Sequence, residues 1–432
     1  AQAAGGCGLA RSVAGTVSSA PGRAGTLSPM AADPRIEFLS AMAAALSRYG
    51  ETADGLEDGL RDCARRLGVD AEFFATPTAV FASFGPSGLQ QTVLLRTREA
   101  AIDLRGLSAV HDVLRHVRTG EATAEQGLAE LRLAMTAPPT FPWPAGVLGS
   151  AAGAASFDLL LGGTWAEAGI AASVGLAVGV LVVLGRRFGR LAHLTELLAG
   201  LLASLLALAW GHLVPDMSPP SVALASLILL LPGLGITLGV AELASRQLAA
   251  GTARLAGAAV TLLNLSIGSF LGTSILRRLE LMPHTHVPDE PTTTVMLVAA
   301  AALSTVALLV ATNSRLADVW LIAVSVGIAL VGARFGAWLV GATLGVAVAS
   351  LIVGLWSNGY GRLARRPAAL ALIPGLAVLV PGSLGYRGIS AFLRESTGGL
   401  EVFGAVLVIA AGLVVGLLVA DATLPPRGAE HP

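Results

Sequence analysis

The chain has 432 residues, of which 54% are hydrophobic and 13% charged, and its 28 basic and 28 acidic residues give a formal net charge of zero. This composition, with a mean hydropathy of +0.73, excludes an ordinary soluble protein and indicates a membrane protein that crosses the bilayer several times. The balanced charge gives no reason to expect nucleic-acid binding.

Few residues of the chain are arranged to bind a metal or a cofactor. The cysteines, Cys7 and Cys63, lack a partner at metal-site spacing, and every basic residue is an arginine, which excludes a lysine Schiff base. His284 and His286 precede two carboxylates in one segment, where a solvated loop is the favoured interpretation. We expect neither a metal nor a cofactor.

The first third of the chain lacks membrane-length apolar segments. Residues 1–33 are rich in Ala, Gly and Ser without the apolar core of a signal peptide, and indicate a disordered tail. Residues 34–136 have the pattern of a small cytoplasmic α/β domain. Its predicted elements are a helix ending before Gly50, a helix over 52–67, a strand over 71–84, a turn over 85–88, a strand over 91–96, and helices over 107–118 and 124–134.

Two motifs bear on the role of this domain. Thr76-Pro77-Thr78 falls inside the first predicted strand, where a proline indicates an edge strand or a bulge, typical of a regulatory or assembly surface. His111 and His116 lie on a predicted amphipathic helix, and no serine stands in a nucleophile-elbow motif. We therefore do not expect an enzyme.

A proline-rich linker over 137–144 leads into the apolar part of the chain. We predict ten transmembrane helices, at about 145–162, 166–185, 194–213, 220–237, 255–276, 293–312, 317–333, 336–357, 367–385 and 402–420. They form two repeats, 145–276 and 293–420, separated by an extracytoplasmic loop over 277–292 and followed by a cytoplasmic tail over 421–432.

The loop arginines predict the orientation. Ten of them, in the loops after every second span, lie on one side, and five lie on the other. Because positively charged loops stay in the cytoplasm, we expect the N-terminal domain and both termini there.

Similar segments recur in the two halves of the apolar region. The segment 171–178 resembles 323–330, and 203–210 resembles 349–356. An odd number of spans per repeat places the two halves in opposite orientations, which is typical of secondary transporters with inverted repeats.

The same helix-breaking pair also occurs in both halves, at Pro232-Gly233 and at Pro374-Gly375. Proline removes a backbone donor and clashes with the preceding turn, so each pair predicts an interrupted helix. In a bilayer such breaks persist where they are buried in protein or line a polar cavity. They therefore predict a binding site between the repeats.

Several motifs together resemble the threonine/serine exporter family. They are Phe73-Phe74-Ala-Thr76-Pro77-Thr78, Pro232-Gly-Leu-Gly-Ile-Thr237 with Glu242-Leu, Gly251-Thr-Ala-Arg254-Leu, and Ile373-Pro-Gly-Leu-Ala-Val-Leu-Val-Pro381-Gly382-Ser383. The resemblance covers about residues 36–420. It implies a bacterial plasma-membrane protein with a cytoplasmic N-terminal domain, ten spans and proton-driven export of small hydroxylated amino acids.

The candidate substrate-binding residues surround the predicted breaks. A zwitterionic amino acid needs free N–H groups for its carboxylate, carbonyl oxygens for its ammonium and a polar partner for its hydroxyl. We assign this role to Pro232, Gly233, Thr237, Asn264, Pro374, Gly375, Pro381, Gly382 and Ser383. For Asn264, hydrogen bonding to a neighbouring helix is the competing interpretation.

Two carboxylates are candidates for proton coupling. Asp158 lies in the first span, and the alternative is that it reaches the outer interface. Glu242 follows the first break, and the alternative is an interfacial ion pair with Arg246, four residues later on the same helix face.

These observations predict an exporter of threonine and serine that exchanges them for protons across a lipid bilayer. The alternatives are a transporter of another small solute such as a dicarboxylate, a passive channel, and a membrane-anchored enzyme or sensor whose N-terminal domain is the active part. The oligomeric state, including a homo-oligomer, is left open.

Overall fold

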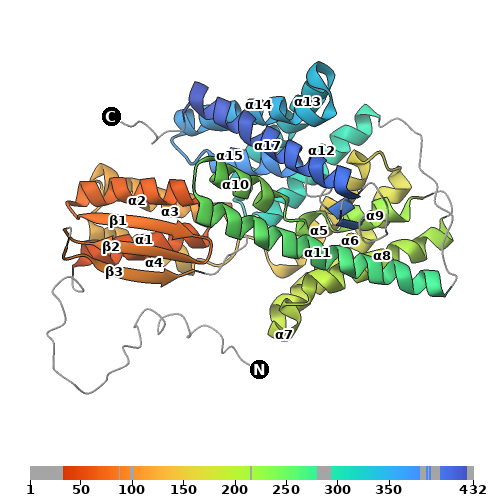
Figure 1. Ribbon diagram of the computed structural model, residues 1–432, viewed down its shortest axis with the longest axis horizontal. Coiled ribbons are helices and arrows are strands. Elements are labelled where there is room, and N and C mark those ends of the chain that lie inside the picture. Colours follow the sequence, from red (N-terminus) through yellow and green to blue (C-terminus); the bar gives the residue numbers. More distant parts are fainter. Residues whose placement is uncertain are drawn as a thin grey trace.

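The computed structural model describes residues 33–86, 88–97, 102–214, 217–279, 293–379, 386–387, 389–390 and 399–425, with the main chain alone for 399–403. A small α/β domain lies at one end of a larger, mainly helical domain (Figure 1). The predictions for Pro381, Gly382, Ser383, His284 and His286 concern positions outside the described residues.

The α/β domain is a three-stranded antiparallel sheet with helices packed on one face. Its elements are α1 (Pro34–Arg48), α2 (Ala53–Leu67), β1 (Ala71–Thr76), β2 (Ala79–Phe84), β3 (Gln91–Arg96), α3 (Leu104–Thr119) and α4 (Ala124–Thr136), and the strand order is β1-β2-β3. Alternate strand residues such as Phe73, Val80 and Phe84 join the helices in one buried core. Since burying apolar surface drives folding, this alternation sets the face of the sheet that the helices cover.

The predicted single strand over 71–84 is wrong. Pro77 and Thr78 form the turn of a hairpin in which Thr76 pairs with Ala79, so β1 and β2 are separate strands. The Thr76 hydroxyl donates to the Ala79 carbonyl at 2.9 Å and accepts from its N–H at 3.1 Å, which closes the turn. Proline suits this position because it has no N–H to offer a strand partner. Pro77 therefore marks the turn of a hairpin and lies neither within a strand nor in a bulge.

The larger domain is made of helices. They are α5 (Trp143–Leu160), α6 (Trp165–Arg187), α7 (Gly189–Ala192), α8 (Thr195–Leu213), α9 (Pro219–Ser226), the 3₁₀ turn η2 (Ile228–Leu230), α10 (Gly233–Ala244), α11 (Leu248–Arg278), α12 (Thr294–Ala311), η3 (Leu316–Asp318), α13 (Val319–Val340), α14 (Ala342–Ala364), α15 (Ala369–Leu379) and α17 (Gly399–Thr423). In the described residues, seven helices are long and apolar enough to cross a membrane, or eight if the bent pair α9–α10 counts as one span. The predicted ten spans are not confirmed.

Small residues let the helices of this domain approach closely. A side chain at Gly272 of α11 would collide with the Ser204 hydroxyl of α8, and one at Gly416 of α17 would collide with the Ser350 hydroxyl of α14. Ser204 donates to the Leu201 carbonyl at 2.9 Å, and Ser350 donates in the same way, three residues back, at 3.0 Å. The same helix contact thus occurs in both halves, on segments that are similar in sequence.

The α/β domain contacts the ends of the helices that face it. The Leu104 N–H donates to the Thr312 carbonyl at 2.9 Å, and the Asn313 amide donates to the Asp103 carboxylate at 2.9 Å. The side-chain oxygen of Asn313 (Oδ1) in turn accepts a hydrogen bond from the backbone N–H of Thr140, in the linker, at 2.8 Å. These hydrogen bonds fix the start of α3 beside the end of α12.

Candidate functional site

The helix is interrupted at Pro232, as predicted. After α9 the chain forms the short turn η2, passes through an extended Leu231, and resumes as α10 at Gly233. The segment Ile228–Ala244 is bent by 47° relative to α9. Pro232 has ψ of 42°, and no side chain caps the N-terminus of α10. The first N–H groups of α10 therefore have no helical partner, and the helix dipole favours a negative group beside them.

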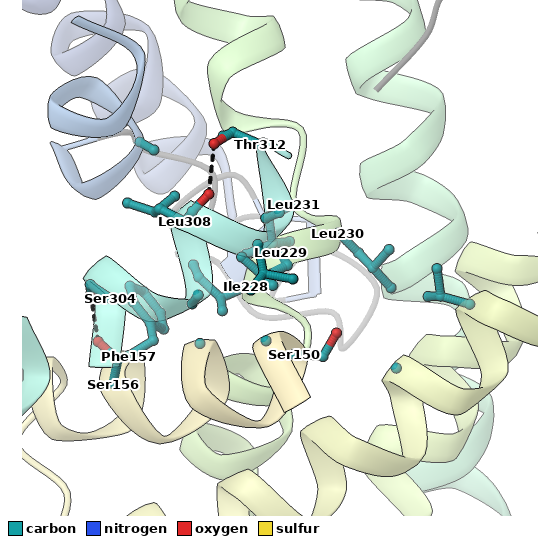
Figure 2. A pocket seen from close by; sticks show the side chains of 18 of the residues that line it. Ser150, Ser156, Phe157, Ile228, Leu229, Leu230, Leu231, Ser304, Leu308 and Thr312 are labelled. Carbon is teal, nitrogen blue, oxygen red and sulfur yellow. Dashed lines mark hydrogen bonds between the residues drawn. The ribbon is translucent and has the colours of Figure 1, made fainter. Parts of the chain in front are cut away.

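This interruption lines a cavity of about 440 Å³. Residues of α5, α6, α12 and α15 form the rest of its wall, together with Ile102 just before α3 (Figure 2). A cavity of this size falls within the range of about 300–1,000 Å³ that is usual for small-molecule sites.

The cavity wall is mostly apolar and carries scattered hydroxyl groups. They belong to Ser150, Ser156, Ser226, Ser304 and Thr312. Ser156 and Ser304, on α5 and α12, are hydrogen-bonded to each other at 2.6 Å, and Ser156 also reaches the Ala300 carbonyl at 2.8 Å. Among the described residues of the wall, Arg186 is the one charged side chain. The site is therefore suited to a small molecule that needs hydroxyl and backbone partners.

The structure places the sequence-predicted substrate residues unevenly. Pro232 and Gly233 line the cavity, whereas Thr237 is buried one turn further along α10 and donates to the Gly233 carbonyl at 3.3 Å. Asn264, on α11, is half-buried and is not part of the cavity wall.

The predicted break at Pro374-Gly375 is wrong. Pro374 lies inside α15, which runs without interruption from Ala369 to Leu379. Pro374 falls in the second turn of this short helix, so it removes one backbone hydrogen bond and the remaining turns hold. Gly375 has a packing role, because a side chain there would meet Val353 of α14 at 2.7 Å. The neighbouring residues Ala377 and Val378 are the ones that line the cavity.

Glu242 forms a buried ion pair. Its carboxylate accepts two hydrogen bonds from the Arg254 guanidinium of α11, at 2.9 and 3.0 Å. The predicted alternative partner, Arg246, is wrong because the chain turns at that residue, which has a φ of 66°. The ion pair therefore joins two helices, α10 and α11, and is not a contact between two residues on the surface of one helix.

Asp158 is fully buried near the end of α5, and neither carboxylate oxygen has a hydrogen-bond partner among the described residues. Its neighbours Phe157 and Leu160 line the cavity, whereas Asp158 does not. The alternative that Asp158 reaches an aqueous interface is therefore wrong in this conformation.

Sequence reasoning missed the hydroxyl groups of α5 and α12. One signal was present: Gly146, Ser150, Gly153 and Phe157 recur at helical spacing and mark the face of α5 that the cavity uses. The partner residue Ser304 has no comparable signal, since it lies 148 positions from Ser156.

Residues 37–276 match the family of threonine/serine exporters, and residues 295–423 match a second domain described as threonine/serine exporter, ThrE. The chain belongs to the threonine/serine exporter family. No solved structure matches it.

Curated fungal proteins are similar to this chain at low identity. An uncharacterised protein of Schizosaccharomyces pombe is 27% identical over 434 residues, which cover 91% of this chain and 56% of the relative. A second uncharacterised protein of that yeast is 28% identical over 56% of this chain and 30% of its own length. Pheromone-regulated membrane protein 10 of Saccharomyces cerevisiae is 29% identical over 56% of this chain and 32% of the relative. The chain therefore aligns with about a third to just over half of each relative's length.

Proposed function

We propose that the chain is a secondary transporter that exports small hydroxylated amino acids such as threonine and serine, coupled to the proton gradient. The observation that carries the proposal is the cavity at the Pro232 interruption, in a chain of the threonine/serine exporter family. An interrupted helix beside a cavity offers the free backbone groups that a zwitterion needs in a low-dielectric site.

The chemistry of the wall favours an amino acid over a dicarboxylate. The uncapped N-terminus of α10 offers N–H groups to one carboxylate, and the carbonyls near η2 offer acceptors to an ammonium. The hydroxyls of Ser156 and Ser304 suit a substrate hydroxyl. A dicarboxylate would need a second cationic partner, and the described wall offers Arg186 alone.

We propose two inverted repeats of five spans as the basis of alternating access. The matched contacts of Ser204 with Gly272 and of Ser350 with Gly416 support this arrangement. Inverted repeats give two related conformations, each open to one side of the membrane.

We further propose that the α/β domain lies on the cytoplasmic side of the plasma membrane. The loops that touch it are among those rich in arginine: Gln247, next to Arg246, donates to the Glu57 carboxylate at 3.4 Å, and Arg366 donates to Ser108 at the same distance. The excess of arginine on this side supports the orientation.

Of the two candidates for proton coupling, Asp158 is the better supported. Glu242 already has a cationic partner at hydrogen-bonding distance, whereas Asp158 has no partner among the described residues. An ionised carboxylate that is buried without a partner is costly, so its charge state depends on access to water.

Counterflow in proteoliposomes tests the proposed function. Vesicles loaded with unlabelled threonine should accumulate labelled threonine from outside, saturably, and an imposed pH gradient should change the extent. Exchange that ignores the gradient would remove the proton coupling. An absence of threonine and serine exchange by folded protein would contradict the substrate assignment.

A further inference from the structure

The turn between α5 and α6 brings two buried carboxylates together. Asp158 lies near the end of α5 and Glu167 in the first turn of α6, and both residues are at most 2% exposed. Gly163 lies against the Asp158 carboxylate, and the N–H of the next residue, Thr164, donates to the Glu167 carboxylate. Glycine shapes this turn, since a side chain at Gly163 would collide with the Asp158 carboxylate, whose Cγ lies 2.8 Å from that position.

The two carboxylates differ in their hydrogen bonding. The oxygens of Glu167 each accept a backbone N–H, one from Thr164 at 2.9 Å and one from Ser218 at 2.8 Å. Asp158 accepts none from the described residues. The two N–H donors stabilise a negative charge on Glu167. No donor among the described residues stabilises a negative charge on Asp158, so a bound proton is the alternative that neutralises it.

No described cation neutralises this pair. Of the helices packed on α5, neither α9 nor α12 contains a charged residue, and the arginines of α6 are at its far end. His212, at the end of α8, is exposed.

We propose that Asp158 and Glu167 form a proton-binding site in which the two carboxylates share one proton, carried by Asp158, and that Glu167 is the second residue of the coupling site. The link to the cavity is structural. The Ser218 N–H donates to Glu167, and Ser218 directly precedes α9. Helix α9 in turn leads to η2 and Pro232 in the cavity wall.

Loss of the proton puts a second negative charge beside Glu167. Two adjacent carboxylates without a cation repel each other, and the repulsion is relieved when the turn separates from α9 or when water enters. Proton occupancy thereby controls how firmly α9 is anchored. The use of this anchoring in the transport cycle rests on the proposed function, whereas the proton-binding site does not.

Infrared spectroscopy of the full-length protein in lipid tests the site without any substrate, so its result stands even if threonine exchange fails. We expect the carbonyl band of a protonated carboxylic acid that titrates with pH. The band should be lost in Asp158→Asn and should titrate over a different pH range in Glu167→Gln. Glu196→Gln, which changes a carboxylate in the first turn of α8, is the control and should leave the band unchanged.

Hydrogen exchange at the Ser218 amide provides a second measurement. In the wild type its protection should change over the pH range in which the band titrates, and in Asp158→Asn it should no longer depend on pH there. A band that survives in Asp158→Asn, or that Glu167→Gln leaves unaltered, would overturn the proposal. Unaltered pH dependence at Ser218 in Asp158→Asn would overturn the link to α9.

Discussion

The Arg366 guanidinium makes two hydrogen bonds to the Asp318 carboxylate, at 2.6 and 3.0 Å, one to the Tyr360 hydroxyl at 3.2 Å, and one, at 3.4 Å, to the Ser108 hydroxyl of the α/β domain. Arg366 follows α14 and Asp318 precedes α13, so one side chain joins two loops of the helical domain to α3. Since α3 starts two residues after Ile102, which lines the cavity, this cluster holds the α/β domain next to the cavity wall.

Removing this guanidinium should loosen the α/β domain. In Arg366→Gln we expect hydrogen exchange at the Leu104 amide, which donates to Thr312, to accelerate roughly 10-fold or more, because a hydrogen bond to a charged group contributes about 1.5–3 kcal/mol. Arg362→Gln is the matched control, since Arg362 bonds to the Pro425 carbonyl. Equal exchange rates at Leu104 in the wild type and Arg366→Gln would show that the cluster does not hold the domain.

The equivalent contacts at Gly272 and Gly416 predict that substitutions at the two glycines reduce stability to a similar extent. Gly272→Val and Gly416→Val each place a branched side chain against a serine hydroxyl, and overpacking of this kind costs about 1–3 kcal/mol. We expect both variants to lower the melting temperature of the detergent-solubilised protein to a similar extent. Gly257→Val should have little effect, because the space beside Gly257 is open. A large loss at one glycine and none at the other would argue against equivalent packing in the two halves.

The Glu51–His111 ion pair predicts a pH-dependent stability of the α/β domain. Burial opposes both charges, but the charge of the partner and a mutual hydrogen bond outweigh it, so the pKa of His111 is raised and that of Glu51 is lowered. His111 therefore contributes stability below the usual histidine pKa of about 6.5, and this is lost as the pH rises through its raised pKa. Glu51 contributes stability above the usual value of about 4.3, which is lost as the pH falls through its lowered pKa.

The difference in the free energy of unfolding between the wild type and His111→Gln should thus be largest, ~1.5 kcal/mol, between pH ~4.3 and ~6.5. Cys63 reports on this domain because its thiol is fully buried. Its reaction with dithiodipyridine in a Cys7→Ser background measures domain opening, and the chain has no further cysteine. An opening difference that stays constant from acid to alkaline pH would contradict the ion-pair account.

Hydropathy and spacing predicted where the helices lie, because membrane-length apolar segments carry that signal within themselves. They did not distinguish Pro232 from Pro374, each of which is followed by Gly-Leu. Pro232 follows a 3₁₀ turn and faces a cavity, whereas Pro374 is held in a helix whose next residue, Gly375, packs against Val353. That difference depends on neighbouring helices and cannot be read from either segment alone.

The polar contacts between residues far apart in the sequence could not be predicted from local sequence patterns either. Asp318 could be read as a helix-start carboxylate and Arg366 as a loop arginine that fixes orientation, yet the two form one ion pair. Glu242 could be paired by helical spacing with Arg246, whereas its partner Arg254 lies on the next helix. Periodicity finds partners on one helix surface, and it gives no information on partners across a turn.

The central claim, that the cavity is the substrate site, is tested most directly by filling it. Gly146 lines the cavity, and a Cβ added there would meet no other atom within 4 Å, so we expect Gly146→Leu to narrow the cavity without a clash. Gly169→Leu makes the same change at an equally open position outside the cavity wall. An overfilled site costs about 1–3 kcal/mol, or roughly a 5- to 150-fold loss of affinity. Counterflow of labelled threonine should fall accordingly in Gly146→Leu and stay normal in Gly169→Leu. Normal counterflow in a folded Gly146→Leu protein would contradict the account.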